Sequence, residues 1–243
     1  MWVPRDSLGR ITAASVLVAL WTASAAAQDL TALIQPPPAA DDPRAARDLA
    51  ALRALQASRT PEQVRAAQSD VDESGFLFRD VLGPQFDARR LPRTADLLAR
   101  AGEAAAAAMN PAKAVWNRLR PSAAAPDLHP CLPVPATASY PSGHAVLGMV
   151  HAALLGRMLP EYRAALFARA RRYAEAREVC GLHYPTDTEA GYAAAAAIGA
   201  VLPTSALEEV ARTELRPALG LPPELLPVAV SAEPPPSEDF RVR

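Results

Sequence analysis

Three side chains in one short stretch could together carry out nucleophilic chemistry: Arg177, His183 and Asp187. Arginine offers a planar, permanently charged fork that fits the oxygens of a phosphate group. Histidine supplies a nitrogen nucleophile or proton carrier near neutral pH. A nearby carboxylate can hold the imidazole in one tautomer and stabilise the positive charge that it acquires. These residue types also fall together by chance in helical proteins, so the stretch must be weighed with the rest of the chain.

A second candidate group is a pair of cations, Lys113 and Arg120, and Lys113 is the only lysine in the chain. Every other basic residue among the lysines and arginines is an arginine, so the one position that keeps a lysine is a candidate for a specific role. Seven residues correspond to about two turns of helix, and we therefore expect both side chains on one helix face. Such a pair could bind an oxyanion, although a solvated basic face would show the same pattern.

A third group lies at 140–144, where Tyr-Pro-Ser-Gly-His precedes a long apolar segment. Ser142 is placed to cap a helix, and Gly143 has no side chain to block the approach of a ligand. The free N–H groups and dipole of a helix start favour anions. His144 could then donate a proton to a leaving oxygen. A serine cap followed by a structural histidine is the simpler alternative, and His151, on the same helix face, is expected in the core.

The composition favours an all-α fold. Alanine is abundant, aromatic residues make up only 5% of the chain, and β-branched runs are absent. The segments 143–159 and 186–202 are apolar almost all round, which predicts two buried helices. We expect helices from Pro43, from Pro61 to Gly75, over 94–109, from Pro111 to Pro121, over 143–159, from Pro160, over 186–202 and over 204–217, with an irregular proline-rich loop at 121–141.

The chain is expected to hold one helical domain, at 43–218. Residues 1–27 have a positively charged start, a short apolar stretch and alanines before Gln28, which together predict a cleaved secretory signal. Its apolar stretch is shorter than the ~20 residues that a spanning helix needs, so an uncleaved anchor is the less favoured alternative. We expect an extended lead-in at 28–42 and a disordered proline-rich tail at 219–243. The net charge of −1 gives no basic field for nucleic acid.

The three groups, taken in order, match the motifs K-x6-R-P, P-S-G-H and S-R-x5-H-x3-D. In this the chain resembles the type 2 phosphatidic acid phosphatase (PAP2)/haloperoxidase superfamily, whose fold is a single-domain helical bundle. Over roughly residues 43–215 it is most similar to the bacterial class A non-specific acid phosphatases. Ala176 stands where the motif usually has serine, and Ala145 where that group usually has threonine. These departures bear on rate and specificity more than on the type of reaction.

The resemblance implies a role for each residue of the three motifs. His183 would attack phosphorus and become a phosphohistidine, with Asp187 orienting its ring. His144 would protonate the leaving alcohol and later activate water. The phosphoryl oxygens would be held by cations and helix-start groups, namely Lys113, Arg120, Arg177, Ser142 and Gly143.

The resemblance also implies that no metal or other cofactor takes part. The rival interpretation, a metal held by His144, His183 and Asp187, is disfavoured because the adjacent cations would repel a divalent ion. The cysteines are two in number, and the signal directs them to an oxidising compartment. Their positions, Cys131 and Cys180, are typical of the family, and we expect them to form a disulfide.

The function expected from the sequence is a periplasmic or secreted acid phosphatase of broad specificity acting on small phosphomonoesters. Histidines with an ordinary pKa of ~6.5 would give a mildly acidic optimum. No membrane partner is expected after signal cleavage, and association into a homo-oligomer is compatible with the sequence. The alternatives are a vanadium-dependent haloperoxidase, a lipid or polyprenyl phosphate phosphatase, and a helical binding module with a decayed site.

Overall fold

The computed structural model describes residues 28–71, 74–200 and 204–224. The predicted signal at 1–27 and most of the predicted tail, from residue 225 onward, lie outside the described residues. Within the described ranges every regular element is helical, which confirms the all-α prediction. The lead-in at 28–42 contains one short helix, α2 (Leu30–Leu33), whose Leu30 is buried in the core.

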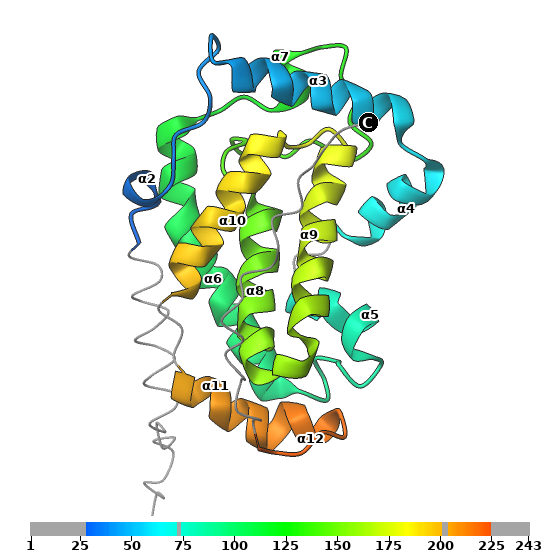
Figure 1. The fold of residues 1–243 in the computed structure, drawn as a ribbon, viewed down its shortest axis with the longest axis vertical. Coiled ribbons are helices and arrows are strands. Elements are labelled where there is room, and N and C mark those ends of the chain that lie inside the picture. Colours follow the sequence, from blue (N-terminus) through cyan, green and yellow to red (C-terminus); the bar gives the residue numbers. More distant parts are fainter. Residues whose placement is uncertain (1–27, 72–73, 201–203, 225–243) are drawn as a thin grey trace, which may run out of the picture.

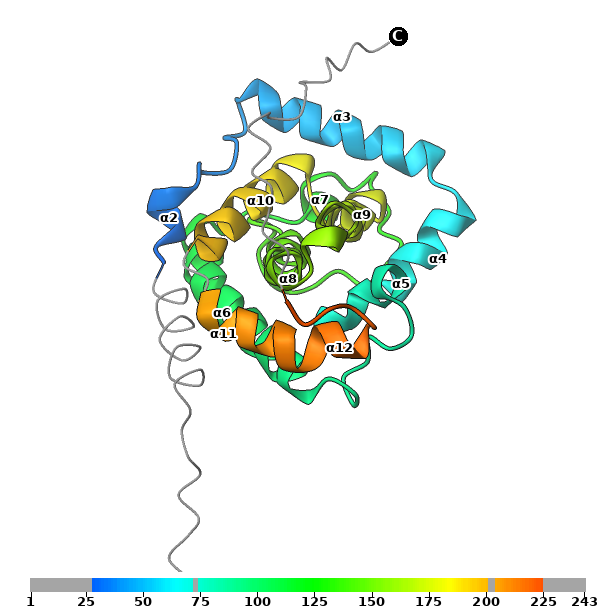
Figure 2. The same cartoon turned by 60° about the horizontal axis from the view of Figure 1, so that its bottom comes forward.

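The fold is built around α8 (Gly143–Met158), which packs against α6 (Pro92–Trp116), α9 (Arg163–Val179) and α10 (Pro185–Gly199). Figure 2 shows α8 in the centre of the molecule with the other helices around it. The predicted segment 143–159 has apolar residues on all sides, and such a helix is stable only when neighbours cover it on all sides. The second predicted buried helix corresponds to α10.

The first turn of α8 approaches the second turn of α10 closely because Gly191 lies at their contact. A Cβ atom on Gly191 would lie 2.5 Å from the Cβ of Ala145 and 2.9 Å from the carbonyl oxygen of Ser142. Real Cβ atoms are not found at such distances, so a side chain at Gly191 would force the two helices apart. Ala145, one of the two departures from the family pattern, is completely buried at this contact.

Residues 92–116 form one helix, α6, where two had been predicted from the Asn-Pro pair at 110–111. Pro111 lies inside this 25-residue helix. A proline removes one backbone donor and strains the preceding turn, at a cost of ~3 kcal/mol or more. The buried stripe of small side chains that includes Ala104, Ala108 and Ala112 runs through this point, and packing along it offsets that cost.

The N-terminal helices lie on one side and across one end of this bundle (Figure 1). α3 (Pro43–Ser58) begins after the cap Asp42, and α4 (Pro61–Ser69) has the predicted capping box between Thr60 and Gln63. α4 ends at Ser69, earlier than the predicted stop at Gly75.

The prediction that Gly75 ends this helix was wrong. Gly75 lies beyond the end of α4, at a close contact with α6. A Cβ on Gly75 would lie 2.8 Å from the side chain of Leu98 on α6. Gly75 accordingly opens a separate 3₁₀ turn against that helix. The remaining short elements are η1 (Gly75–Phe78), α5 (Arg79–Leu82), α7 (Pro121–Ala124), η2 (Pro160–Tyr162), α11 (Thr204–Val210), the π-helical turn η3 (Ala211–Leu215) and α12 (Arg216–Ala218).

Candidate active site

His183 and Asp187 meet at the start of α10. The Nδ1 atom of His183 lies 3.2 Å from Oδ2 of Asp187. His183 precedes the helix and Asp187 lies in its first turn, where the backbone N–H of Tyr184 also donates to Oδ2 of Asp187 at 3.0 Å. Both side chains are buried. The spacing of four residues noted in the sequence therefore places a carboxylate against the imidazole.

Two further side chains fix the carboxylate of Asp187. The hydroxyl of Ser139 donates to Oδ2 at 2.5 Å, and the guanidinium of Arg118 donates to Oδ1 at 2.6 Å. Burial by itself would raise the pKa of Asp187, but His183, Arg118 and the Ser139 hydroxyl together lower it below its ordinary value. Asp187 therefore carries its negative charge over a wide pH range.

The contacts of His183 assign its tautomer. Nε2 of His183 lies 2.8 Å from Nη1 of Arg120. A guanidinium can only donate, so Nε2 must be the unprotonated nitrogen, and Nδ1 carries the proton that is donated to Asp187. The ring thus presents a lone pair on Nε2, on the side away from the carboxylate.

Three buried cations, Lys113, Arg120 and Arg177, are held by backbone carbonyls. Lys113 Nζ donates to Ala138 at 2.8 Å, and Arg120 Nε donates to Thr137 at 2.9 Å. These carbonyls belong to the long loop before α8. The same loop therefore holds both the Lys113 and the Arg120 side chain through its backbone carbonyls.

The expectation that Lys113 and Arg120 share one helix face was wrong. α6 ends at Trp116, and Asn117 then adopts the left-handed conformation, with φ of 42°. An asparagine tolerates this conformation better than most residues, and it turns the chain out of the helix. Arg120 therefore reaches the site from a turn rather than from the helix that carries Lys113.

The P-S-G-H group forms the start of α8, as predicted. Ser142 is the N-cap, its hydroxyl accepts from the N–H of Ala145 at 3.5 Å, and its own N–H donates to the carbonyl of Asp187 at 2.9 Å. The backbones of the two helix starts are thus joined directly. His144, in the first turn, stacks on Tyr173 of α9 with ring centroids 4.9 Å apart.

The charges around His144 show that the three motif groups converge. Its pKa is lowered to about 3, first because of burial and then because of Arg177, His183, Arg120 and Lys113. The pKa of His183 is lowered to about 4, mainly by burial, although the hydrogen bond and charge of Asp187 oppose this shift. Both imidazoles are therefore neutral in the free protein at neutral pH.

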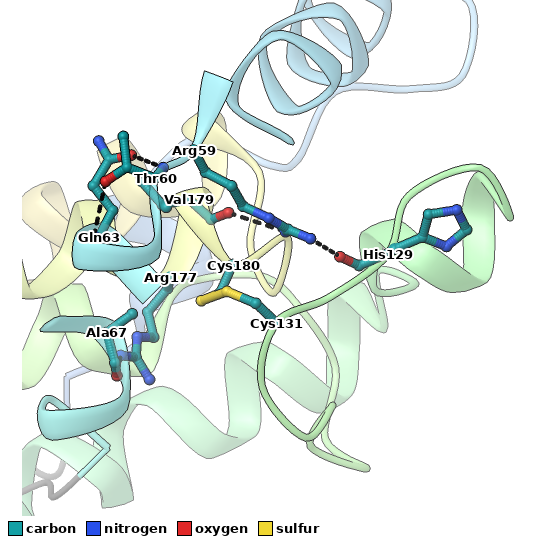
Figure 3. Close-up of a disulfide and its surroundings, with 9 residues drawn as sticks. All are labelled: Arg59, Thr60, Gln63, Ala67, His129, Cys131, Arg177, Val179 and Cys180. Carbon is teal, nitrogen blue, oxygen red and sulfur yellow. Dashed lines mark hydrogen bonds between the residues drawn. A yellow bond between two sulfur atoms is a disulfide. The ribbon is translucent and has the colours of Figure 1, made fainter. Parts of the chain in front are cut away.

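The predicted disulfide is present, and its Cys180 lies between Arg177 and His183 in the sequence. Cys131 and Cys180 are bonded, with their Cα atoms 4.7 Å apart. Figure 3 shows Arg59 beside the bridge, donating to the carbonyl of His129 at 2.9 Å. The disulfide and Arg59 together tie the proline-rich loop to the end of α9.

Arg177 contacts the N-terminal helix α4. Its Nη2 donates to the carbonyl of Ala67 on α4 at 2.5 Å (Figure 3). Ala176, the second departure from the family pattern, packs beside Ala67 and Cys180 in a small apolar cluster.

The two remaining histidines, His151 and His129, have surroundings different from those of His144 and His183. His151 is buried and its Nε2 lies 3.0 Å from the carbonyl of Leu98, so it is the core residue that the sequence predicts. His129 is exposed, and its ring points away from the disulfide (Figure 3).

Sequence reasoning missed Arg118, Ser139 and Asp48. Arg118 lies between the two predicted cations, and a third cation in that run was an available signal. Asp48 shares the buried face of α3 with Leu52, and a carboxylate on an apolar helix face indicates a buried partner. Ser139 offered no comparable signal.

The sequence of the chain is similar to those of known proteins. The model of the PAP2 superfamily matches residues 98–210, which include all three motif groups. A non-specific acid phosphatase of Salmonella typhimurium is 30% identical over 172 residues, which cover 65% of this chain and 67% of that protein. The chain belongs to the PAP2 superfamily. The recognised resemblance to this family is therefore confirmed.

Two further proteins are similar to this member of the PAP2 superfamily. An acid phosphatase of Zymomonas mobilis is 29% identical over 65% of this chain, and the match spans 63% of that enzyme. The transmembrane PAP2-type phosphatidylglycerolphosphate phosphatase of Bacillus subtilis superposes with a TM-score of 0.46 at 17% identity, covering 80% of this chain and 94% of its own. In the described part of the present chain, none of the helices combines the length and apolar character needed to cross a membrane.

Proposed function

We propose that this protein is an exported, metal-independent acid phosphatase that hydrolyses small phosphomonoesters through a phosphohistidine on His183. The observation that carries the proposal is the tautomer of His183. Asp187 holds the proton on Nδ1, and Arg120 lies against the lone pair of Nε2. A nucleophile with its lone pair directed at a cation is arranged to meet the phosphorus of an anionic ester.

In the first step, Nε2 of His183 attacks phosphorus and the bond from phosphorus to the ester oxygen breaks. The leaving oxygen keeps the bonding electron pair and takes a proton from His144. The three cations and the N–H groups at the start of α8 bind the phosphoryl oxygens and stabilise the charge of the transition state. Arg120 must exchange its contact with Nε2 for one with a phosphoryl oxygen.

In the second step, water attacks the phosphohistidine. His144 takes a proton from the water, and the phosphorus–nitrogen bond breaks with its electron pair returning to Nε2. Free phosphate leaves, and both histidines regain their starting states. Asp187 remains ionised throughout and stabilises the positive charge on the imidazole ring of the intermediate.

His144 must be protonated to act in the first step, although its pKa is about 3 in the free protein. A bound phosphate dianion opposes the charges of Arg177, Arg120 and Lys113, which lower that pKa. The substrate thereby raises the pKa of His144 and supplies the condition for proton donation. Acidic medium assists this protonation, which agrees with the similarity of the chain to acid phosphatases of Zymomonas mobilis and Salmonella typhimurium.

Export is supported by the disulfide between Cys131 and Cys180, since such bonds persist in oxidising compartments. The charged and apolar pattern of residues 1–27 supports the same localisation. Substrate breadth follows from the resemblance to non-specific acid phosphatases, and the proposal is limited to phosphomonoesters as a class.

The test is hydrolysis of p-nitrophenyl phosphate from pH 4 to 9 by protein recovered after export, with EDTA and with vanadate. We expect activity that peaks in acid, survives EDTA and is inhibited by vanadate. His183→Ala should abolish it, by at least about a thousandfold, while His129→Ala, an exposed histidine outside the site, should retain it.

A rapid quench should trap phosphate on the wild type in an acid-labile, alkali-stable form, and on His183→Ala not at all. Intact mass of the exported protein reports both the cleavage point and the absence of free thiols. Activity that needs an added metal, or that persists in His183→Ala, would refute the proposal. Bromide oxidation by the vanadate-loaded protein would favour a haloperoxidase instead.

A further inference from the structure

The anchoring of Asp187 extends to the N-terminal helix α3. Arg118 Nη1 donates to Asp187, while its Nη2 donates at 2.7 Å to Oδ2 of Asp48. The side chain of Asp48 is only 3% exposed and that of Arg118 only 12%. One guanidinium thus bridges two buried carboxylates, one beside the candidate nucleophile and one on a helix that lies outside the matched PAP2 region at 98–210.

Asp48 also contacts the start of α10 directly. Its carboxylate accepts from the N–H of Thr186 at 3.2 Å and from the Thr186 hydroxyl at 2.5 Å. The N–H groups of a first helical turn have no partner within the helix, and a carboxylate there is favoured by the helix dipole. Asp48 therefore holds the residue next to Asp187 in addition to holding Arg118.

Arg118 is fixed on its remaining side by an aromatic ring. Its guanidinium carbon lies 3.8 Å from the centroid of Tyr184, the residue after His183. Cation–aromatic stacking, two charge-assisted bonds to carboxylates and a bond to the Thr186 hydroxyl at 2.8 Å hold the guanidinium in this orientation. If Asp48 loses its charge, Arg118 keeps only one of its two carboxylate anchors.

We propose that Asp48 is a positioning residue that acts through Arg118 to hold Asp187, and hence the His183 ring, in the geometry needed for attack. The kinetic part of this proposal rests on the proposed phosphatase function. Its geometric part concerns the hydrogen bond between His183 and Asp187 and does not depend on any activity.

The chain offers a matched control on the same helix. Arg53 of α3 forms an ion pair with Asp127 at 2.7 Å, but the two side chains are 50% and 55% exposed and the pair includes neither Asp48 nor Arg118. Arg53→Gln therefore removes an ion pair between α3 and the rest of the molecule without touching the network of Asp48.

The experiment compares Asp48→Asn, Arg118→Lys, their double variant and Arg53→Gln in the full exported protein. Asparagine keeps the shape of the side chain and one acceptor oxygen, and lysine keeps the charge but lacks the fork that bridges two carboxylates. Circular dichroism at the assay temperature verifies that each variant is folded. The measured quantities are kcat and KM for p-nitrophenyl phosphate and the imidazole ¹⁵N spectrum.

We expect Asp48→Asn to lower kcat by about tenfold or more, as for other residues that orient a catalytic group, and to change KM by less than about threefold, because the cations that bind phosphate are intact. The double variant should be little worse than either single one, since both break one chain of contacts. Arg53→Gln should match the wild type. Additive losses, or an unchanged kcat in Asp48→Asn, would overturn the proposal.

The ¹⁵N spectrum tests the geometry independently, since the chain has only four histidines and His183→Ala assigns one of them. In the wild type, His183 should show a single tautomer protonated on Nδ1. Asp48→Asn should broaden or shift this signal, and Arg53→Gln should not. If the wild type has no phosphatase activity but the signal responds, the proposed function fails and the positioning role stands; if the signal of a folded Asp48→Asn variant is unchanged, the positioning role fails.

Discussion

The starts of α8 and α10 lie side by side, yet they are occupied in opposite ways. The first turn of α10 carries the carboxylate of Asp187, and Asp48 binds the N–H of Thr186 in the same turn. The first turn of α8 has no acidic residue, and the charges that act on His144 within it are those of cations. Both helix starts attract anions by the same physics, but one is filled by the protein's own carboxylates.

This difference assigns complementary tasks to the two histidines. The carboxylate at α10 supports positive charge on His183, which a phosphohistidine requires. At α8 an incoming anion must supply the negative charge that His144 needs before it can hold a proton. Under the proposed function, two similar local structures would therefore serve as a fixed support for the nucleophile and as a receptor for the substrate.

Removing the charge at the α10 start should have the largest effect. In Asp187→Asn the side-chain amide can donate to Nδ1 of His183, which would place the ring proton on Nε2 and block attack. We expect kcat to fall by about a thousandfold in steady-state assays. Vanadate binding serves as the control and should be largely retained; a loss of kcat below tenfold would contradict the assigned tautomer.

Adding a charge at the α8 start should abolish its role as a receptor. A Cβ at Gly143 would meet only Met109, at 3.4 Å and beyond, so Gly143→Asp introduces no severe clash at the Cβ position. Its carboxylate would compete for the anion position, and we expect vanadate affinity to fall by about a hundredfold, close to 3 kcal/mol. Gly143→Ala is the neutral control and should lose less than about tenfold. Equal losses in both variants would show that bulk rather than charge is responsible.

The dependence of His144 on its ligand can be measured directly. Saturating inorganic phosphate should raise the pKa of His144 from about 3 by at least about one unit, since the dianion offsets the charges of Arg177, Arg120 and Lys113. A ¹⁵N-imidazole titration with and without phosphate gives both values. His151, whose pKa of about 4 results from burial, is the internal reference and should not respond. An unchanged pKa for His144 would place the phosphate elsewhere.

The smallest expected effect concerns stability in acid. His144, His151 and His183 all have pKa values lowered to about 3–4 in the folded protein. Below an ordinary pKa of about 6.5 the unfolded chain binds protons that the folded chain does not, so stability is complete above that pH and falls as the pH is lowered toward 4.

Urea unfolding between pH 7 and pH 4 measures this loss. His151→Gln keeps a hydrogen-bonding side chain but cannot titrate, and it should reduce the pH dependence of the unfolding free energy by about one proton near pH 5. The variant leaves the two site histidines in place. A slope identical to that of the wild type would mean that His151 is protonated in the folded protein.

Local signals in the sequence predicted the helix starts well. The capping box at Thr60 and Gln63 and the serine cap before His144 involve residues three or fewer positions apart, and both are present. The spacing between His183 and Asp187 likewise belongs to one helix start. Such features depend only on residues within about one helical turn of each other, so they can be predicted from the local sequence.

Features that depend on distant partners were missed or mistaken. Asp48 and Arg118 are 70 positions apart, and only the folded chain shows that they touch. The break predicted at Pro111 failed because the packing of α6 offsets the local cost of the proline. Arg120 lies at the predicted site, but the helical spacing from Lys113 does not explain its position. The helix ends before Arg120, because Asn117 adopts the left-handed conformation and turns the chain.

The close contact at Gly191 restricts how this site can evolve. Any side chain there would push against Ala145 and Ser142, and so would shift the receptor relative to the nucleophile. Substitutions that alter the start of α8 and those that alter α10 near Gly191 must therefore be compatible with each other, so these two segments are expected to change together in evolution.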